Sequence, residues 1–445
     1  MAQSTFRSLN GFNYRMWAGG ATVSNLGTWM QRTAQDWVVL TKLTHHDAAA
    51  VGIVMALQFG PLVLLLPLTG FAADHLDRRR LLLVTQTIMG LLALGLSILT
   101  MTGLLQLWQV YLFALLLGRV GAFDSPARQT FVSDLVPEAE LSNAVALNSA
   151  SFNAARMVGP AIAGILIAAV GSGWVFLINA ASFGAVIAAL GLLRTGELHR
   201  RKKTPPTRRG FAEGFRYVWG RPDLRAILLM LFLVGTFGLN FPIFISAMSV
   251  MAFHAGATRY GLLTSTMAIG SVFGALLAAR REKPGMALLL LTTTVLGLAF
   301  ALAAMMPTLG LFGLALILVG ASAQTFTTTV NSMLQLSTDP AMRGRVVAIL
   351  LAVAVGGTPI GAPIVGWIAD SRGPRWAMGL GAASGFAATL VGISYLVRYR
   401  HLRLGFMKGS PHVTLDGSDA SSPTPALDRL LVERKTRSLR APPGT

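Results

Sequence analysis

The chain has 445 residues, of which 53% are hydrophobic and 12% charged, and its formal net charge is +19. A soluble fold of this size has no room to bury so much apolar surface, so we expect a protein that crosses a membrane repeatedly. The basic residues stand in segments between apolar runs rather than on one face of a soluble domain, which argues against nucleic-acid binding. The absence of cysteine excludes disulfides, iron–sulfur clusters and thiolate metal sites.

Twelve apolar runs follow one another along the chain, each near the 20 residues that a helix needs to cross the hydrocarbon core. The first run is long and contains Arg32 and Asp36, unlike a cleavable signal peptide, so we expect it to remain in the mature protein. The predicted fold class is therefore all-α, a polytopic membrane protein with twelve transmembrane helices. The expected spans are 16–40, 50–73, 80–102, 107–128, 142–170, 173–194, 226–252, 259–279, 284–306, 308–333, 344–369 and 375–397.

The longest interruption divides these spans six and six. Its first part, Thr195 to Arg209, is a basic linker that contains two prolines, and its second part, Phe211 to Trp219, is an amphipathic stretch suited to the membrane surface. We favour topology and attraction to anionic lipid over a partner-docking site as the reason for its charge. The expected organisation is a cytoplasmic N-terminus (1–15), a six-helix bundle (16–194), a basic cytoplasmic linker (195–225), a second six-helix bundle (226–397) and a cytoplasmic, largely disordered tail (398–445) with one candidate short helix at Leu427 to Leu439.

Lysine and arginine orient the spans. If the N-terminus is cytoplasmic, thirty of these residues fall on the cytoplasmic side, four on the outer side and three within spans. Short cationic loops resist translocation, so we expect both termini in the cytoplasm. The turn between spans two and three, with Arg78, Arg79 and Arg80, contributes strongly to this orientation.

Two weak matches suggest an internal duplication. Gly159-Pro160-Ala-Ile-Ala-Gly164 in span five corresponds to Gly361-Ala-Pro363-Ile-Val-Gly366 in span eleven, about 202 positions later. Val51-Gly52 in span two likewise corresponds to Tyr260-Gly261 in span eight, 209 positions later. Similar offsets are expected when a transporter is built from two pseudo-symmetric bundles around a midplane site.

The turn between spans two and three also suggests a family. It carries Gly70, an aspartate four residues later (Asp74) and a basic cluster (Arg78 to Arg80), and it is similar to the corresponding loop of the major facilitator superfamily. His75 and Asp77 replace the arginine and glycine that are usual there.

Further segments resemble one branch of this superfamily. Ala122 to Gln129, Asn143 to Asn148 and the later Gly159-Pro160 resemble the branch that includes siderophore exporters and macrolide or multidrug efflux proteins. The resemblance covers about residues 10 to 400. It implies the major facilitator fold and transport of a small molecule by alternating access.

The resemblance also implies roles for two motifs. The turn, with Gly70, Asp74, Arg78, Arg79 and Arg80, would help to close the cytoplasmic side, and the alternative is a plain topogenic turn. The Gly159, Pro160 and Gly164 motif resembles that of exporters, in which proline kinks the helix, and the alternative is packing alone. Ala155 stands where the full exporter motif has another glycine.

Polar residues inside the spans indicate where the chemistry lies, because charges at membrane depth face the interior and need partners. Arg32 and Asp36 stand four apart on one helical face and are candidates for a local pair. Asp36 is the candidate proton carrier, and the alternative is a static ion pair near the outer surface. The residues expected to line a substrate and proton pathway are Gln31, Arg32, Gln35, Asp36, Arg119, Asn148, Asn153 and Arg156.

Asp124 and Arg128, also four apart, flank Pro126 where span four meets the cytoplasm. We assign them to the gating region and favour a structural clamp over substrate contact.

Together these features predict a secondary active transporter, a monomer in the cytoplasmic membrane that exports a drug, siderophore or other secondary metabolite, coupled to protons. The alternatives are an importer or uniporter of the same superfamily, or a non-transporting scaffold or receptor. An enzyme or primary pump is not expected, because the sequence contains no GxxxxGK[ST], HExxH or GxSxG. No cofactor and no metal site is predicted, and the expected partners are a small-molecule substrate, protons and lipid.

Overall fold

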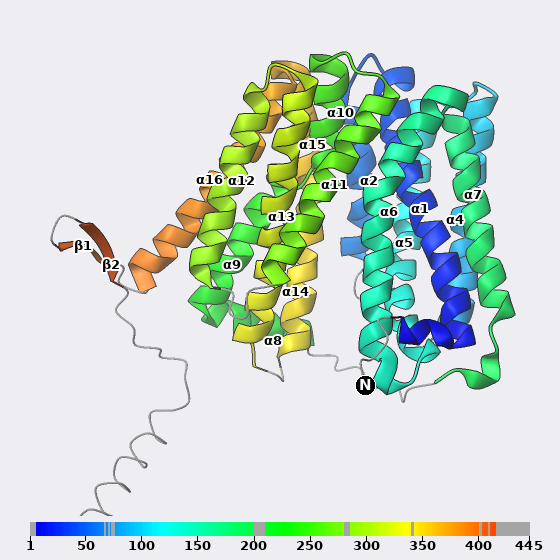
Figure 1. Cartoon of the computed structure of the whole chain (residues 1–445), viewed down its shortest axis with the longest axis horizontal. Coiled ribbons are helices and arrows are strands. Elements are labelled where there is room, and N and C mark those ends of the chain that lie inside the picture. Colours follow the sequence, from blue (N-terminus) through cyan, green and yellow to red (C-terminus); the bar gives the residue numbers. More distant parts are fainter. Residues whose placement is uncertain are drawn as a thin grey trace, which may run out of the picture. The chain divides into compact units, whose positions relative to one another are not determined.

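The computed structural model describes residues 6–65, 68–69, 72, 76–199, 210–279, 285–339, 342–399, 403–407 and 410–414. The first half of the chain forms long helices joined by short turns (Figure 1). Its elements are η1 (Arg7–Asn10), α1 (Phe12–Val38), the π-turn η2 (Val39–Leu43), α2 (Ala48–Leu64), α4 (Arg78–Met101), α5 (Leu107–Leu135), η3 (Glu138–Glu140), α6 (Leu141–Val170), α7 (Ser172–Leu192) and η4 (Thr195–Glu197).

The second half is also helical but more often interrupted. Its elements are α8 (Gly210–Gly220), α9 (Pro222–Leu233), the π-turn η5 (Val234–Gly238), α10 (Phe241–Ala247), the π-turn η6 (Met248–Ala252), α11 (Ala257–Ala279), α12 (Met286–Met305), α13 (Leu309–Ser337), α14 (Arg343–Gly356), α15 (Thr358–Arg372) and α16 (Pro374–Tyr399).

Ten helical stretches among the described residues are long and apolar enough to span a membrane. Two of the twelve expected spans fall outside this count. The described part of α2 has 17 residues, and α1 carries Arg32 and Asp36 among other polar side chains. The chain is therefore a multi-pass membrane protein.

Two expected spans are single stretches in hydropathy but broken helices in the structure. Span seven consists of α9, η5, α10 and η6, and Pro242 lies in the first turn of α10. Span eleven consists of α14 and α15, which meet at Gly357 just before Pro359. Proline lacks the amide hydrogen that would continue the helix ladder, so both breaks have a local cause.

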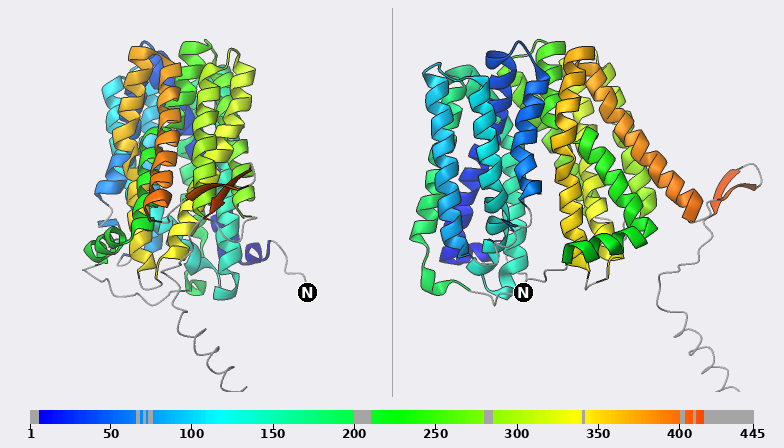
Figure 2. Two further views of the ribbon diagram at one scale, coloured as in Figure 1. Left: turned by 90° about the vertical axis from the view of Figure 1, so that its left-hand side faces the viewer. Right: turned by 180° about the vertical axis from the view of Figure 1, so that it is seen from behind.

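Packing follows the order of the helices. In the first half, α1 packs on α6 and α7, α4 on α5 and α7, and α2 on α5. In the second half, α11 and α12 pack on α13. The two halves meet where α2 packs on α15 and α6 on α11 (Figures 1 and 2).

We call the end at which α1 begins the lower end, as in Figure 1, and the opposite end the upper end. At the upper end both contacts between the halves are made through glycine. A Cβ on Gly164 of α6 would lie 2.6 Å from the Ala257 carbonyl oxygen of α11, and Gly261 of α11 faces Pro160 in the same way. Gly52 of α2 meets Ala362 of α15 in the second contact. These are the glycines that the repeat comparison pairs, so the two contacts use matching positions of the two halves.

The amphipathic stretch of the linker forms α8, which runs across the lower end (Figure 2). Glu213 pairs with Arg345 of α14 at 2.8 Å, and the Tyr217 hydroxyl donates to Asp339 at 3.0 Å. The rings of Phe215 and Trp219 stack on each other and are 51% and 63% exposed. One side of α8 is thus held by protein, and the other presents aromatic rings, as expected of a helix at a membrane surface.

Residues 393–445 form a separate unit, of which the structure describes the end of α16 and a hairpin. Strands β1 (Arg403–Met407) and β2 (Ser410–Thr414) are antiparallel, with Arg403 opposite Thr414. The sequence analysis expected a largely disordered tail and no strands in this region. Strands are hard to predict here because Gly405 and Pro411 are poor strand formers, although proline is tolerated on an edge strand. The candidate helix at Leu427 to Leu439 lies outside the described residues.

Candidate functional site

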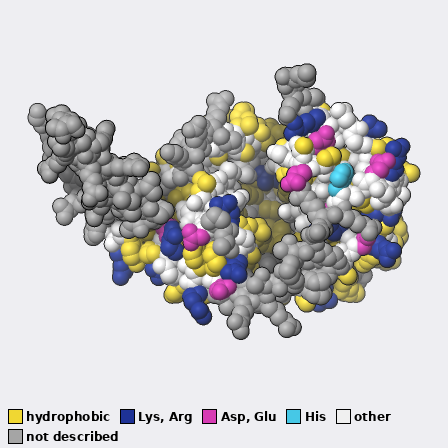
Figure 3. All heavy atoms as spheres, turned by 90° about the horizontal axis from the view of Figure 1, so that it is seen from below, with side chains coloured by type: hydrophobic (Ala, Val, Ile, Leu, Met, Phe, Trp, Pro, Cys, Tyr) yellow, Lys and Arg dark blue, Asp and Glu magenta, His cyan; other side chains and the backbone are white. Residues whose placement is uncertain are grey.

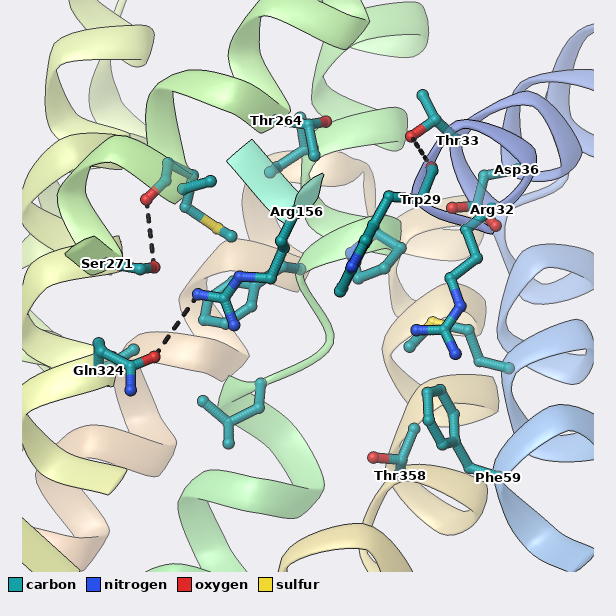
Figure 4. A pocket seen from close by; sticks show the side chains of 18 of the residues that line it. Trp29, Arg32, Thr33, Asp36, Phe59, Arg156, Thr264, Ser271, Gln324 and Thr358 are labelled. Carbon is teal, nitrogen blue, oxygen red and sulfur yellow. Dashed lines mark hydrogen bonds between the residues drawn. The ribbon is translucent and has the colours of Figure 1, made fainter. Parts of the chain in front are cut away.

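A cavity of about 330 Å³ lies between helices of the first half and helices of the second half (Figure 4). α1, α2 and α6 line one side, and α10, α11, α13 and the start of α15 line the other. Both broken spans contribute to its wall, through Pro242 and Thr358. Its charged lining residues are Arg32, Asp36 and Arg156.

A second cavity of about 670 Å³ lies below the first, among the helices of the first half. Arg32, Gln58 and Phe59 line both cavities, so the two are adjacent parts of one path. The lower part of this path reaches Asp124 and Arg128. Seen from below, the surface is hollowed at this end, with hydrophobic side chains in the hollow (Figure 3).

Arg32 and Asp36 stand one turn apart on α1, and both line the upper cavity. Both lie within the described part of the chain, and their side chains form no ion pair there. The Arg32 guanidinium instead lies over the rings of Trp29, 5.1 Å from its centroid, and Phe59, 5.7 Å from its centroid. Asp36 is 8% exposed, and its carboxylate accepts a hydrogen bond from the Tyr260 hydroxyl at 3.4 Å. The predicted local pair is therefore replaced by a contact from α1 to α11.

Arg156 reaches the same cavity from α6 (Figure 4). Its guanidinium donates to the Gln324 side-chain oxygen of α13 at 3.5 Å. Neither Gln324 nor Tyr260 was predicted as a site residue. The sequence contains a sign of Gln324, because this residue begins a run of polar residues in an otherwise apolar span. Tyr260 stands beside Gly261 of the repeat, and nothing else in the sequence distinguishes it.

The remaining polar residues predicted on α1 and α6 line the lower cavity. Asn148 and Asn153 lie on its α6 wall, and Gln31 accepts a hydrogen bond from Asn179 at 2.6 Å. Gln35 is 2% exposed, and neither polar atom of its side chain has a partner among the described residues.

Arg119 differs from the prediction. Its side chain is exposed, and it is not among the residues that line the two cavities. The helical period explains this placement: Arg119 is about 140° around α5 from Asp124 and about 180° from Arg128, both of which line the lower cavity. A long arginine side chain on the outer face of a helix can extend toward the membrane surface.

Asp124 is the centre of a buried network. Its carboxylate accepts hydrogen bonds from Thr85 at 2.7 Å and Gln86 at 2.6 Å on α4, and from Arg128 at 3.2 Å on its own helix. Arg128 also donates to Asn25 of α1 at 3.3 Å. These contacts tie α5 to α4 and α1.

Of the turn between spans two and three, Gly70 and Asp74 lie outside the described residues. Arg78 pairs with Asp134 of α5 at 2.7 Å, and Arg79 donates to the Leu190 carbonyl of α7 at 2.8 Å. Asp77 caps α4 by accepting from the Arg80 amide at 2.9 Å, while the Arg80 side chain is exposed. Asp77, which replaces a glycine usual in the superfamily, thus starts the helix.

The Gly159-Pro160 motif lies where α6 meets two neighbours. A Cβ on Gly159 would come within 2.8 Å of the Trp29 Cβ on α1, and Pro160 and Gly164 face α11. α6 continues through Pro160 to Val170. The motif therefore permits close packing next to the upper cavity.

The family model of transmembrane secretion effectors matches residues 3–404. The chain is 29% identical over 367 residues to the multidrug efflux pump Tap of Mycolicibacterium fortuitum, covering 79% of this chain and 88% of Tap. It is 27% identical over 395 residues to the enterobactin exporter EntS of Shigella flexneri (85% and 90% covered). It is 26% identical over 353 residues to the staphyloferrin A transporter of Staphylococcus aureus (78% and 87% covered).

Solved structures share the fold. A bacterial homologue of the human lysosomal transporter Spinster, inward-facing and occupied, superposes with a TM-score of 0.67 at 15% identity, covering 89% of this chain and 98% of that one. The nucleoside transporter NupG superposes with a TM-score of 0.68 at 14% identity (87% and 99% covered). The relatives found by sequence are transporters and not enzymes. Because the family model spans most of the chain and the helices follow the fold of these transporters, the chain belongs to the transmembrane secretion effector family of the major facilitator superfamily.

Proposed function

We propose that the protein is a secondary active exporter that moves a small molecule out of the cell by alternating access. One observation gives the strongest support for this function. Side chains from both halves of the chain line one cavity, which continues toward the lower end, while glycine contacts hold the halves together at the upper end. Alternating access requires such a central site with one end closed.

In this proposal the twelve expected spans form two pseudo-symmetric six-helix bundles, 16–194 and 226–397, joined by the basic linker 195–225. The protein acts as a monomer in the cytoplasmic membrane. The lower end faces the cytoplasm with both termini, because thirty of the lysines and arginines then lie on that side against four outside. In this orientation the cavity opens toward the cytoplasm, which is the inward-open state that takes up substrate.

Export is supported by the relatives, which include a multidrug efflux pump and a siderophore exporter. We assign substrate contact to the polar residues of the two cavities: Gln31, Arg32, Gln35, Asp36, Asn148, Asn153 and Arg156. We assign closure of the cytoplasmic side to the turn around Gly70 and Asp74 with its three arginines.

Proton coupling is assigned to Asp36. It is the one carboxylate among the residues that line the upper cavity, and its hydrogen bond from Tyr260 joins the two halves. A proton on Asp36 would change both the charge of the cavity and this contact, which links protonation to the conformational cycle.

The function is tested in everted membrane vesicles that contain the protein and are acidified by respiration. Compounds from a panel of dyes, antibiotics and siderophores are added while acridine fluorescence reports the proton gradient. A transported compound should collapse part of the gradient in vesicles with the protein and not in vesicles without it. Asp36→Asn should abolish this response, whereas Arg119→Gln, an exposed arginine within a span, should preserve it. Undiminished coupling in Asp36→Asn would disprove the carrier role, and no response to any compound would count against proton-coupled export.

A further inference from the structure

The upper cavity has an excess of positive charge. Among its lining residues are two guanidinium groups, Arg32 and Arg156, and one carboxylate, Asp36. Neither arginine has an acidic partner within 4 Å in the described chain: Arg32 lies over two aromatic rings, and Arg156 bonds the neutral side chain of Gln324. Arg32 also borders the lower cavity, whose other charged groups, Asp124 and Arg128, pair with each other. The unpaired positive charge therefore lies at the upper cavity and at its border with the lower one.

Cations at membrane depth are costly and are normally paired with an anion or a carbonyl. The two guanidiniums at this cavity have no acidic partner among the described residues, so the cavity is suited to bind an anionic ligand. A guanidinium presents a planar fork of donors that fits a carboxylate with two parallel hydrogen bonds. A cationic ligand would meet two like charges instead, and the single carboxylate already accepts a hydrogen bond from Tyr260.

The walls of the cavity add a second preference. Trp29 lies between the two arginines, with Phe59 below Arg32 (Figure 4). Phe241, Met55 and Met267 extend this apolar part of the wall, next to hydroxyl and amide side chains. Aromatic and thioether side chains favour a flat, apolar ligand body over a fully hydrated one.

We propose, building on the export function above, that the substrate is an aromatic acid: an apolar ring system with a carboxylate that binds the guanidinium of Arg156, while Arg32 adds a second positive charge on the other side of Trp29. The cavity selects this anion against a cation of the same shape. Arg156 and Gln324 set the selectivity from opposite halves of the chain, so binding of the anion also draws α6 and α13 toward one ligand.

Equilibrium binding to the purified full chain in lipid nanodiscs tests this selectivity. Three probes share one ring system and differ in charge: pyrenebutyrate, its methyl ester, and pyrenebutyl-trimethylammonium. Fluorescence anisotropy should give at least tenfold tighter binding for the acid than for either of the others. Arg156→Gln should weaken binding of the acid about 10- to 100-fold, the loss expected for one charged hydrogen-bond partner, and leave the ester unchanged. Arg119→Gln is the matched control, since this arginine lies in a span but does not line the cavity, and it should bind as the wild type does.

A second variant tests the idea by reversing the charge balance. Gln324→Glu places a carboxylate within reach of Arg156. This substitution should weaken binding of the acid and strengthen binding of the trimethylammonium probe. Circular dichroism and a single gel-filtration peak verify that each variant is folded. Equal affinity for the three probes, tighter binding of the cation, absence of binding by the acid, or an unaffected acid affinity in folded Arg156→Gln would overturn the proposal. Binding is measured without a gradient, so a chain that binds the acid but does not transport fails only the export function.

Discussion

Replacing Gly164 with alanine is expected to open the upper end of the protein. Gly164 lies where α6 meets α11, and an added Cβ would stand 2.6 Å from the Ala257 carbonyl oxygen and 3.1 Å from the Thr258 Cα. Both atoms belong to the backbone of α11, so no flexible side chain can move aside. The two helices must separate by several tenths of an ångström, or the contact must break.

The size of the effect follows from the cost of overpacking. An extra methyl group in a close-packed contact costs about 1–3 kcal/mol. In the proposed transport cycle this contact exists only while the upper end is closed, so the cost falls on one state. A difference of this size shifts the ratio of closed to open states by about 5- to 150-fold.

The shift can be measured by electron spin resonance between two spin labels. The chain contains no cysteine, so labels enter only where cysteine is introduced. Leu104, between α4 and α5, and Pro307, between α12 and α13, are exposed at the upper end and lie in different halves. Gly164→Ala should add a population with a longer distance between these labels. Gly184→Ala on α7 is the matched control, because a Cβ there meets no atom within 4 Å.

One result would refute this reasoning. If both Gly164→Ala and the bulkier Gly164→Leu reach the membrane folded and show the distance distribution of the Gly184→Ala control, the α6–α11 contact does not hold the upper end closed. The glycine would then serve packing that is common to both states.

Two further substitutions test other contacts. Asp370→Asn should weaken the upper end where α15 meets α2, because the Asp370 carboxylate accepts hydrogen bonds from the amides of Ala48 at 2.7 Å and Ala49 at 2.8 Å, and an amide side chain keeps only one acceptor oxygen. We expect the substitution to destabilise the closed upper end by about 1 kcal/mol, which would appear as a longer distance between the same spin labels. The distance in Asp370→Glu should be closer to that of the wild type. Asp124→Ala should lower the melting temperature in detergent and cost about 3 kcal/mol, because it leaves Arg128 without its acidic partner in a largely buried site. Asp124→Ala combined with Arg128→Ala should cost less than the sum of the single changes, and additive costs would show that the two residues act independently.

The sequence predicted the membrane class, the helical fold and the polar face of α1 well, for physical reasons. Gln31, Arg32, Gln35 and Asp36 recur within little more than one helical turn, and such a group at membrane depth can only face a cavity or another helix. The structure places all four along the two cavities. The prediction depended on a pattern within one helix, and there the sequence is informative.

Contacts between distant helices were not predictable in the same way. A single Tyr260 or Gln324 in an apolar span gives no sign of which helix it will face, because that depends on how α11 and α13 pack on α1 and α6. The breaks in spans seven and eleven were missed because hydropathy runs through them without interruption. Pro242 and Pro359 marked both breaks locally. The prediction for Arg119 used only its position along the span. Its angle around α5, about 140° from Asp124, places it on a different face of the helix.

The repeat explains why the two contacts at the upper end resemble each other and also why they differ. Gly164 and Gly261 make one contact, and their repeat partners Gly366 and Gly52 make the other. The offset of 202 that relates Gly164 to Gly366 relates Asp370 to an alanine in α6, so only the contact between α2 and α15 has a carboxylate on a helix N-terminus. A charged group at this position adds to the packing that both contacts share. The α6–α11 contact has no such carboxylate: it consists of close packing and one long hydrogen bond, from the Thr258 hydroxyl to the Gly164 carbonyl at 3.4 Å. A single methyl group at Gly164 is therefore expected to disturb it, whereas the α2–α15 contact is best weakened by removing the charge of Asp370.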